Sequence, residues 1–195
     1  MRKAVFSRRQ GFIRRVHRCF KDRPGAGATS VHMEQDDLLR PYAGQVRVRV
    51  GGLLVRNGAI LLAAHRGLLP NGASFWSPPG GGWAFGENLK AALQREFREE
   101  TGLVVQVGRQ LHLHEFRRGE LQALEIFFEV KTTDDSPTPL LGHDPEHAPG
   151  NQLLSELAWL TPRQLLAIPL AQVHPVLRGL LSTDDVFVPQ VLLEQ

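Results

Sequence analysis

Three glutamates, Glu96, Glu99 and Glu100, stand within five consecutive positions and form what we call the carboxylate cluster. On a helix, Glu96 and Glu100 are like charges four residues apart, a pairing that costs stability. Carboxylates crowded in this way either share protons or bind a cation. Mg²⁺ and Mn²⁺ prefer oxygen ligands, so the spacing favours a divalent metal site. The alternative is a solvated charge run in which Arg95 and Glu99 form an ordinary ion pair.

The segment before the cluster strengthens the metal hypothesis. Gly80, Gly81 and Gly82 leave the backbone unshielded, so that amide groups can approach an anion. Glu87 can accept hydrogen bonds from the first N–H groups of a following helix, or pair with Arg95. A glycine-rich turn beside carboxylates offers what a bound pyrophosphate needs: amides and cations to offset its charge, and a carboxylate to activate water.

The elements that must position these residues follow from the sequence pattern. A helix is expected over 89–101, capped by Asn88 and ended by Gly102. At 100° per residue the carboxylate cluster falls on the same side as Leu89, Ala92 and Leu93. The helix should therefore bury its apolar first half and present the carboxylates toward a cleft.

The remaining pattern mixes strands with a few helices. Residues 45–66 read as one β-hairpin around the Asn-Gly turn in RNGA, and 67–87 read as a loop rich in Gly and Pro. A strand at 103–107 and a hairpin of 111–116 with 121–130 follow. After a polar loop at 132–152 come a strand at 156–160, a helix starting at Pro162 and a last helix near 174–181. This order predicts a single α/β (α+β) domain over 41–195.

Charge is unevenly distributed along the chain. Residues 1–32 hold nine Lys/Arg against one acidic residue, a balance of +8, whereas the remaining residues sum to −5. Nucleic acid is therefore not an expected partner of the folded domain. Residues 1–40 are interpreted as a basic N-terminal extension. A targeting segment, a basic arm, a loose extension and a start at Met33 stay open for this segment.

Composition restricts the class of protein further. No apolar run approaches the length of a membrane span, so no membrane helix is expected. The single cysteine, Cys19, excludes an internal disulfide and fits a cytoplasmic protein.

The segment GGWAFGENLKAALQREFREETGL, residues 81–103, resembles the Nudix box of the Nudix hydrolase family. The box is a glycine, five residues, Glu, seven residues, then Arg-Glu-U-x-Glu-Glu-x-Gly-U, where U is a bulky aliphatic residue. Phe97 is the one soft departure, and we expect it to pack against the sheet. The fixed positions are all filled, namely by Gly81, Glu87, Arg95, Glu96, Glu99, Glu100 and Gly102.

The resemblance implies an α/β/α sandwich with a mixed β-sheet and hydrolysis of a nucleoside diphosphate linked to another moiety, with Mg²⁺ or Mn²⁺ as cofactor. By position, Glu96, Glu99 and Glu100 would ligate the metal. Arg95 would orient Glu99 or Glu87, and Gly81, with Gly82 beside it, would shape the substrate loop. Homodimers are common in the family, so a homodimer stays open.

Several residues outside the box were weighed for function. Glu125 and Glu146 are candidates for the base that activates water, although each is expected to be structural or exposed. His112, His114, His143 and His147 are interpreted as polar or partly buried side chains and not as a metal cluster. Arg117 and Arg118 are expected in a solvated turn. Phe75, Trp76 and Trp83 could stack on a base or pack in the core.

Sequence does not select the substrate. The proline and tyrosine that mark some subfamilies about fifteen residues beyond Gly102 are absent, and no coenzyme A signature precedes the box. A non-catalytic nucleotide sensor on the same fold is the main alternative function. A diphosphate isomerase is disfavoured, because that chemistry uses a cysteine and residues 33–195 contain none.

Overall fold

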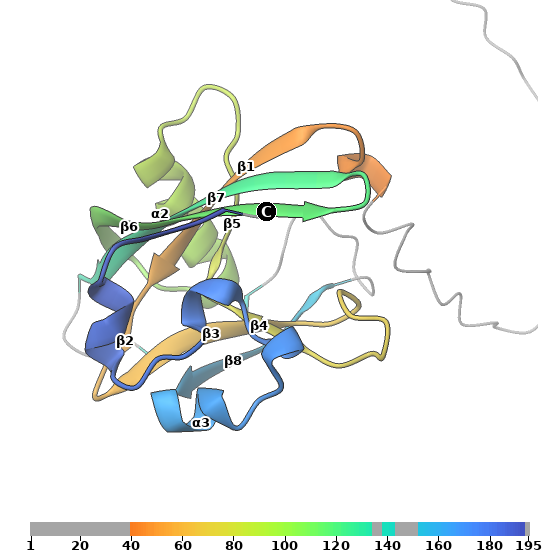
Figure 1. Ribbon diagram of the computed structural model, residues 1–195. Helices are drawn as coiled ribbons and strands as arrows, with labels where there is room; N and C mark the ends of the chain where they lie inside the picture. Colours follow the sequence, from red (N-terminus) through yellow and green to blue (C-terminus); the bar gives the residue numbers. More distant parts are fainter. Residues whose placement is uncertain (1–39, 134–137, 143–151, 194–195) are drawn as a thin grey trace, which may run out of the picture. The chain divides into compact units, whose positions relative to one another are not determined.

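The computed structural model describes residues 40–133, 138–142 and 152–193 (Figure 1). Its helices are α2 (Leu89–Thr101) and α3 (Pro162–Leu166), with short 3-10 turns η1 (Arg40–Tyr42), η2 (Leu170–Gln172), η3 (Pro175–Leu177) and η4 (Thr183–Phe187). The strands are β1 (Val46–Leu53), β2 (Val55–Arg56), β3 (Ala59–His65), β4 (Phe75–Ser77), β5 (Gly80–Gly82), β6 (Val105–Arg118), β7 (Leu121–Thr132), β8 (Leu154–Leu160) and β9 (Gln190–Leu192).

The strands form two sheets. The first has the order β5-β1-β7-β6-β9, with β1 parallel to β7 and β6 parallel to β9, while the other neighbours are antiparallel. The second sheet is antiparallel, and its strand β3 pairs with β2, β4 and β8. The predicted α/β class with a mixed sheet is confirmed.

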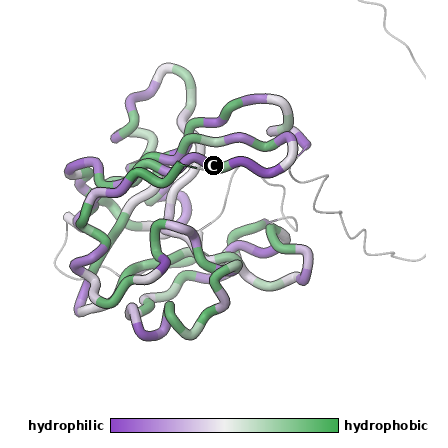
Figure 2. The backbone as a smooth tube through the Cα atoms, in the orientation of Figure 1, coloured by the Kyte–Doolittle hydropathy of each residue, from purple (hydrophilic) through white to green (hydrophobic). Residues whose placement is uncertain are grey.

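Two apolar clusters hold these layers together. Helix α2 packs on β1, β5 and β6, and its Phe97 lies fully buried in a cluster that includes Leu61 and Phe128. A second cluster joins the two sheets to α3 and the 3-10 turns, with Leu62 and Phe127 among its members. Hydrophobic and hydrophilic residues are interspersed along the strands (Figure 2), and the neighbouring Phe127 and Phe128 of β7 belong to different clusters, so the first sheet packs on both faces. The expected packing of Phe97 against the sheet is confirmed.

The predicted hairpin over 45–66 is wrong in its first half. Only β2 and β3 form a hairpin, around Asn57 and Gly58, which both have positive φ. β1 belongs to the other sheet, where it lies between β5 and β7. This central position depends on Gly51 and Gly52, because a Cβ on either would meet the ring of Phe127 or Phe97 at about 2.5 Å.

Three further predictions differ from the structure. The expected loop at 67–87 contains β4, which pairs with β3, and β5, whose glycines pair with β1. The expected helix at 174–181 is the 3-10 turn η3, whose regular structure ends at Arg178. The strands expected at 103–107 and 111–116 are one strand, β6, which continues through bulges near Gln110.

Candidate active site

Helix α2 carries the carboxylate cluster as the sequence predicted. The Asn88 side chain accepts a hydrogen bond from the Ala91 amide, and Gly102 ends the helix in the left-handed conformation. Glu96 and Glu100 are buried, with 9% and 6% of their surfaces exposed, while Glu99 is half-buried. The cluster is therefore not a solvated charge run.

Strand β5 holds two of these carboxylates in place. The Gly80 amide donates to Oε2 of Glu100 at 2.9 Å. A Cβ on Gly81 would lie 2.5 Å from the carboxylate of Glu96, so the absent side chain makes room for that group. Gly80 itself has φ 151°, and a Cβ there would meet the Val50 carbonyl oxygen at 2.1 Å. The glycines serve the site through close packing of a strand and not through a flexible loop.

Arg95 connects the glutamates of the helix to the segment that precedes it. Its Nη1 donates to Glu96 Oε1 at 2.8 Å and to Glu99 Oε2 at 3.1 Å. Its Nη2 donates to Glu87 Oε1 at 2.9 Å and to the Gly82 carbonyl at 3.0 Å. Two interactions were considered for Glu87: accepting from the first N–H groups of the helix, or pairing with Arg95. The pair with Arg95 is observed, and Asn88 caps the helix instead.

The pKa values in this region reflect burial and the single guanidinium. Burial raises the pKa of Glu96, and the charge of Glu99 adds to this, while Arg95 opposes both. The hydrogen bond from Arg95 holds the pKa of Glu87 below its usual value. Three carboxylates, Glu87, Glu96 and Glu99, thus share the guanidinium of Arg95, an excess of negative charge that a divalent cation would offset.

The donor set fits Mg²⁺ or Mn²⁺ by its chemistry. Glu96, Glu99 and Glu100 supply carboxylate oxygens, the ligand type that these ions prefer. Arg95 already contacts Glu96 and Glu99, so it fixes the orientation of two of the three groups. The carboxylate cluster therefore has both the ligands and the charge for a divalent ion.

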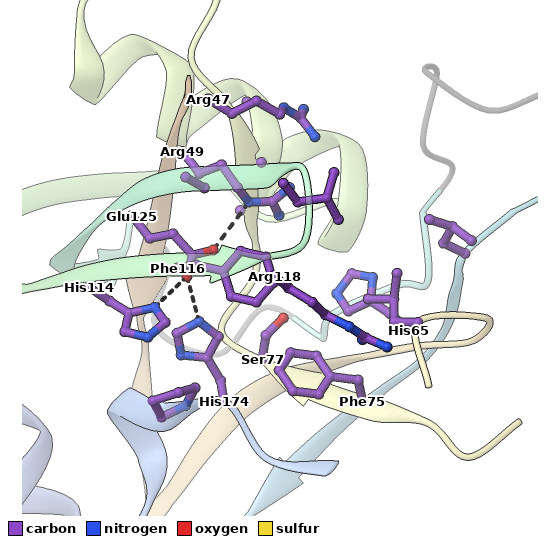
Figure 3. Close-up of a pocket in the computed structure, with 18 of the residues that line it drawn as sticks. Arg47, Arg49, His65, Phe75, Ser77, His114, Phe116, Arg118, Glu125 and His174 are labelled. Carbon is purple, nitrogen blue, oxygen red and sulfur yellow. Dashed lines mark hydrogen bonds and ion pairs between the residues drawn. The ribbon is translucent and has the colours of Figure 1, made fainter. Parts of the chain in front are cut away.

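A cavity of about 450 Å³ opens beside the cluster (Figure 3). Glu96 and Glu100 line it together with Gly80, Gly81 and Gly82, whereas Glu99 lies outside its wall. Side chains that line the more distant wall come from both sheets and include Arg47, Arg49, His65, Phe75, Phe116 and Arg118.

Four aromatic and arginine predictions can now be separated. Phe75 lines the cavity, whereas Trp76 packs against the core and Trp83 donates from its indole to the Glu87 carbonyl at 2.7 Å. Arg118 is exposed, as expected for a solvated residue, but it also lines the cavity.

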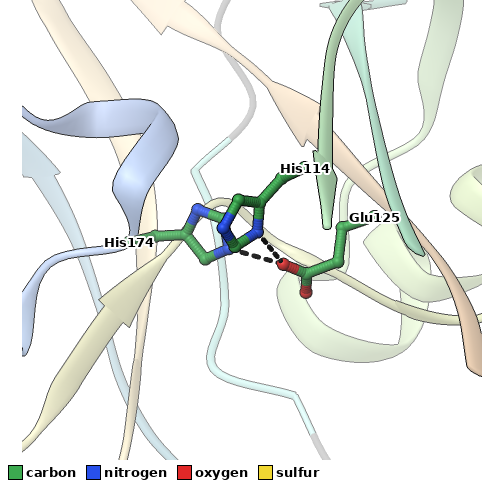
Figure 4. A group of neighbouring side chains, drawn as sticks. All are labelled: His114, Glu125 and His174. Carbon is green, nitrogen blue, oxygen red and sulfur yellow. Dashed lines mark hydrogen bonds and ion pairs between the residues drawn. The ribbon is translucent and has the colours of Figure 1, made fainter. Parts of the chain in front are cut away.

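A second polar group lies in the cavity wall, and we call it the buried network: His114, Glu125 and His174 (Figure 4), together with Arg49 (Figure 3). Oε2 of Glu125 accepts from His114 Nδ1 and from His174 Nε2, each at 2.8 Å. Its Oε1 lies 3.4 Å from Arg49 Nε. Arg49, Glu125 and His114 are direct neighbours in register on β1, β7 and β6.

The electrostatics of the buried network centre on Glu125. Burial alone would raise the pKa of Glu125, but hydrogen bonds from His114 and His174 and the nearby charge of Arg49 hold it well below its usual range. Burial lowers the pKa of His174 in spite of Glu125. These contacts favour the ionised form of Glu125, whose side chain is not exposed, so of the two sequence interpretations, structural or exposed, the second is wrong.

The sequence reasoning missed Arg49 and His174. Alternation on β1, β6 and β7 could have aligned Arg49, Glu125 and His114, once the strand order was known. His174 lies 49 residues after Glu125 in the chain, just before η3, where no local pattern marks it. His112 donates from Nε2 to the Val186 carbonyl at 2.8 Å and is a buried core histidine. His143, His147 and Glu146 lie outside the described residues.

Comparisons with known proteins bear on the family and the fold of the chain. The NUDIX domain family model matches residues 45–181. A Mycobacterium tuberculosis protein named "Putative 8-oxo-dGTP diphosphatase 2" is 46% identical over 59 residues, which cover 30% of this chain and 41% of that protein. The match thus spans about two fifths of the curated relative's length.

Two solved structures share the fold. The solution structure of the E. coli ORF135 protein is 23% identical with a TM-score of 0.51, and the match covers 67% of this chain and 82% of that one. A NUDIX hydrolase from Nitrosomonas europaea is 20% identical with a TM-score of 0.54, covering 68% and 84%. At such identities the likeness concerns the fold alone. Within the described residues, no helix is long and apolar enough to cross a membrane.

Proposed function

Because the chain belongs to the Nudix domain family, we propose that it hydrolyses a pyrophosphate bond in a nucleoside diphosphate linked to another moiety, with Mg²⁺ or Mn²⁺. One observation carries the proposal. Three carboxylates of helix α2 lie together, two of them, Glu96 and Glu99, sharing the guanidinium of Arg95, while Glu96 and Glu100 line a cavity of about 450 Å³. That arrangement leaves negative charge for a cation and space for a substrate.

Glu96, Glu99 and Glu100 would hold the metal. A bound divalent ion neutralises phosphate oxygens and lowers the pKa of its water. The chain's own residues keep the ligands in position: the Gly80 amide fixes Glu100, and Arg95 fixes Glu96 and Glu99. Gly81 keeps the space that the Glu96 carboxylate occupies.

The base that deprotonates the attacking water is a carboxylate of the cluster or one from a later loop. Glu125 is a poor choice, because two imidazoles and a guanidinium stabilise its ionised form and occupy its oxygens. A base must release those partners before it can accept a proton. Glu146 lies outside the described residues and stays a candidate.

The name of the Mycobacterium tuberculosis relative suggests which substrates to try first. Its 59 matching residues support the inclusion of 8-oxo-dGTP among the nucleotides tested. Other dNTPs, NDP-sugars, dinucleotides and capped RNA ends complete the range that the sequence leaves open.

The alternative function is a nucleotide sensor that binds without hydrolysis. The intact carboxylate cluster favours the enzyme, because a sensor could lose Glu99 or Glu100 without penalty. The two differ in turnover: a sensor binds a nucleotide with Mg²⁺ but releases neither phosphate nor nucleoside monophosphate.

The test is a nucleotide panel assayed with Mg²⁺ and with Mn²⁺ for released phosphate, pyrophosphate or nucleoside monophosphate. We expect turnover of at least one substrate by the wild-type chain and its loss in the presence of EDTA. Glu99→Gln should lower kcat by about a thousandfold or more, since a metal ligand stabilises several kcal/mol of transition-state charge. The exposed Glu156→Gln is the matched control and should retain full activity. Full activity of folded Glu99→Gln would refute the assignment.

A further inference from the structure

The buried network has the composition of a metal site, yet its hydrogen bonds point to another role. Two histidine nitrogens and a carboxylate oxygen lie within 4.8 Å of one another, a two-His-one-carboxylate set. The Val176 amide, however, donates to Nδ1 of His174 at 3.3 Å. Nδ1 must therefore carry a lone pair, which places the ring proton on Nε2, and Nε2 donates that proton to Glu125.

The same atom cannot both donate a proton and ligate a metal. Binding an ion through His174 Nε2 would require that nitrogen to lose its proton while Nδ1 faces an N–H donor. The cation of Arg49, 3.4 Å from Glu125 Oε1, repels a second positive charge at the same carboxylate. The network is thus complete without a metal ion.

What the buried network holds is Arg49. Both imidazoles are 6% exposed and Glu125 is 15% exposed, whereas the Arg49 side chain is 34% exposed and lines the cavity. Among the described residues, Arg49 forms an ion pair with Glu125 alone, and the atom of Arg49 nearest to that carboxylate is Nε. The two terminal NH₂ groups of the guanidinium are left for a ligand (Figure 3).

Arg49 also lies between the two ends of the cavity. On β1 it pairs in register with Gly82 of β5, whose carbonyl accepts from Arg95. On its other side it pairs with Glu125 of β7. Its charge acts on Glu96 as well as on Glu125, which places the guanidinium within electrostatic reach of the carboxylate cluster.

We propose that Arg49 binds a phosphate of the substrate with its terminal NH₂ groups, and that Glu125, held by His114 and His174, is a positioning residue that fixes Nε of Arg49. This inference rests on the proposed function, since it takes a nucleoside diphosphate derivative as the ligand. A guanidinium offers forked donors that match phosphate oxygens. A fixed Nε reduces the side-chain entropy that is lost when the fork engages the phosphate.

The test measures binding separately from hydrolysis. Methylenediphosphonate, a diphosphate that cannot be hydrolysed, is titrated into the full chain at constant Mg²⁺, and the Kd is obtained from amide chemical shifts. Arg49→Gln should weaken binding by about tenfold to a hundredfold, the range for a charge-assisted pair. The control is Arg109→Gln, because Arg109 Nε also lies 3.4 Å from a glutamate oxygen, that of Glu129, while the residue lies outside the cavity wall. Equal Kd values for Arg49→Gln and wild type would overturn the inference.

Glu125→Gln separates positioning from simple charge. Removing a negative charge from the cavity should tighten anion binding by Coulomb's law. If Glu125 positions Arg49, its loss should instead weaken binding, by about threefold to tenfold. Arg49→Lys keeps the charge but loses the Nε that Glu125 holds, and should be weakened by about tenfold. Tighter binding by folded Glu125→Gln, or full affinity in Arg49→Lys, would contradict the positioning role.

A spectroscopic measurement covers the case in which Glu125→Gln does not fold. Long-range ¹⁵N–¹H spectra of the wild-type chain should show His174 protonated on Nε2 both before and after addition of Zn²⁺. Loss of the Nε2 proton with Zn²⁺ would make the network a metal site and overturn the inference. A chain that binds neither nucleotides nor methylenediphosphonate contradicts the proposed function itself. Unchanged binding by the Arg49 variants overturns only the role of Arg49 and leaves that function intact.

Discussion

The two glutamate-bearing ends of the cavity differ in the number of donors that each carboxylate receives. In the carboxylate cluster, Arg95 is shared by Glu96, Glu99 and the preceding Glu87. In the buried network, Glu125 alone receives two imidazole N–H groups and faces a guanidinium. Glu96 and Glu99 thus share one nitrogen, Nη1 of Arg95, whereas Glu125 has three side-chain partners of its own.

This difference suits the two ends of the cavity to different functions. Carboxylates without enough protein donors gain from a cation, so the cluster suits metal binding. A carboxylate with a complete set of donors is stable by itself and can hold its neighbours in fixed positions. The number of glutamates near a cavity therefore says less about metal binding than the number of donors around each.

Among changes that leave every carboxylate in place, the largest effect should come from filling the space at the carboxylate end. In Gly81→Ala, the new Cβ would lie 2.5 Å from the Glu96 carboxylate, which must rotate away from its position. We expect kcat to fall by about tenfold to a hundredfold, as for loss of a group that orients a ligand. The melting temperature should change little, because the displaced group is the end of a flexible side chain.

Gly119→Ala provides the opposite pattern as a control. Gly119 has φ 58° in the β6–β7 turn and no heavy atom within 4 Å of a built Cβ. We expect a stability loss of about 1 kcal/mol from backbone strain with no change in kcat. If Gly81→Ala retained full turnover, the close packing of β5 on Glu96 would not matter for the site.

A smaller effect is expected on the pH dependence of folding stability, through His65 in the cavity wall. Burial and the charge of Arg49 lower the pKa of His65 to about 4. Between pH 6.5 and 4 the unfolded chain therefore binds a proton at this residue that the folded chain does not. Stability should fall as pH decreases through this window, by roughly 2–3 kcal/mol for His65.

Thermal unfolding of wild type and His65→Gln at pH 7, 6, 5 and 4.5 isolates this contribution. Burial also lowers the pKa of His112 and His174, so the wild-type curve contains their effects in the same direction. The variant should lose less stability than wild type between pH 7 and 4.5. Parallel curves for the two proteins would exclude His65 as a source of the pH dependence.

The smallest effect is expected from removal of residues 1–32. The carboxylate cluster, the buried network and the cavity wall are all built from residues between 42 and 178. The truncated chain should keep kcat and KM within about twofold of the full chain, measured on the substrate that the panel identifies. A folded but inactive truncation would show that the N-terminal segment takes part in the reaction.

The sequence was most informative where function depends on local spacing. Helix α2, its caps at Asn88 and Gly102, and the inward side of Glu96 and Glu100 were predictable, because helical periodicity and capping act within a few residues. The pairing of Arg95 with Glu87 or Glu99 was also expected from spacing, and both contacts are present.

What the sequence did not reveal depends on long-range pairing. The alternating residues of β1 looked like half of a hairpin with β3, yet β1 pairs with β7, more than seventy residues later in the chain. The strand order brings Arg49 beside Glu125, and a 3-10 turn near the C-terminus adds His174. No local signal encodes such contacts, because any strand with the same alternation could fill the same place.

The most direct test of the account is a Mn²⁺ titration at neutral pH, followed by electron paramagnetic resonance. It compares three proteins: the wild type, a triple variant that combines Glu96→Gln with Glu99→Gln and Glu100→Gln, and the single variant Glu125→Gln. The account predicts that wild type binds Mn²⁺, that the triple variant loses this binding, and that folded Glu125→Gln retains it. Unchanged binding in the triple variant, or loss of binding in Glu125→Gln alone, would contradict the assignment of the cation to the carboxylate cluster.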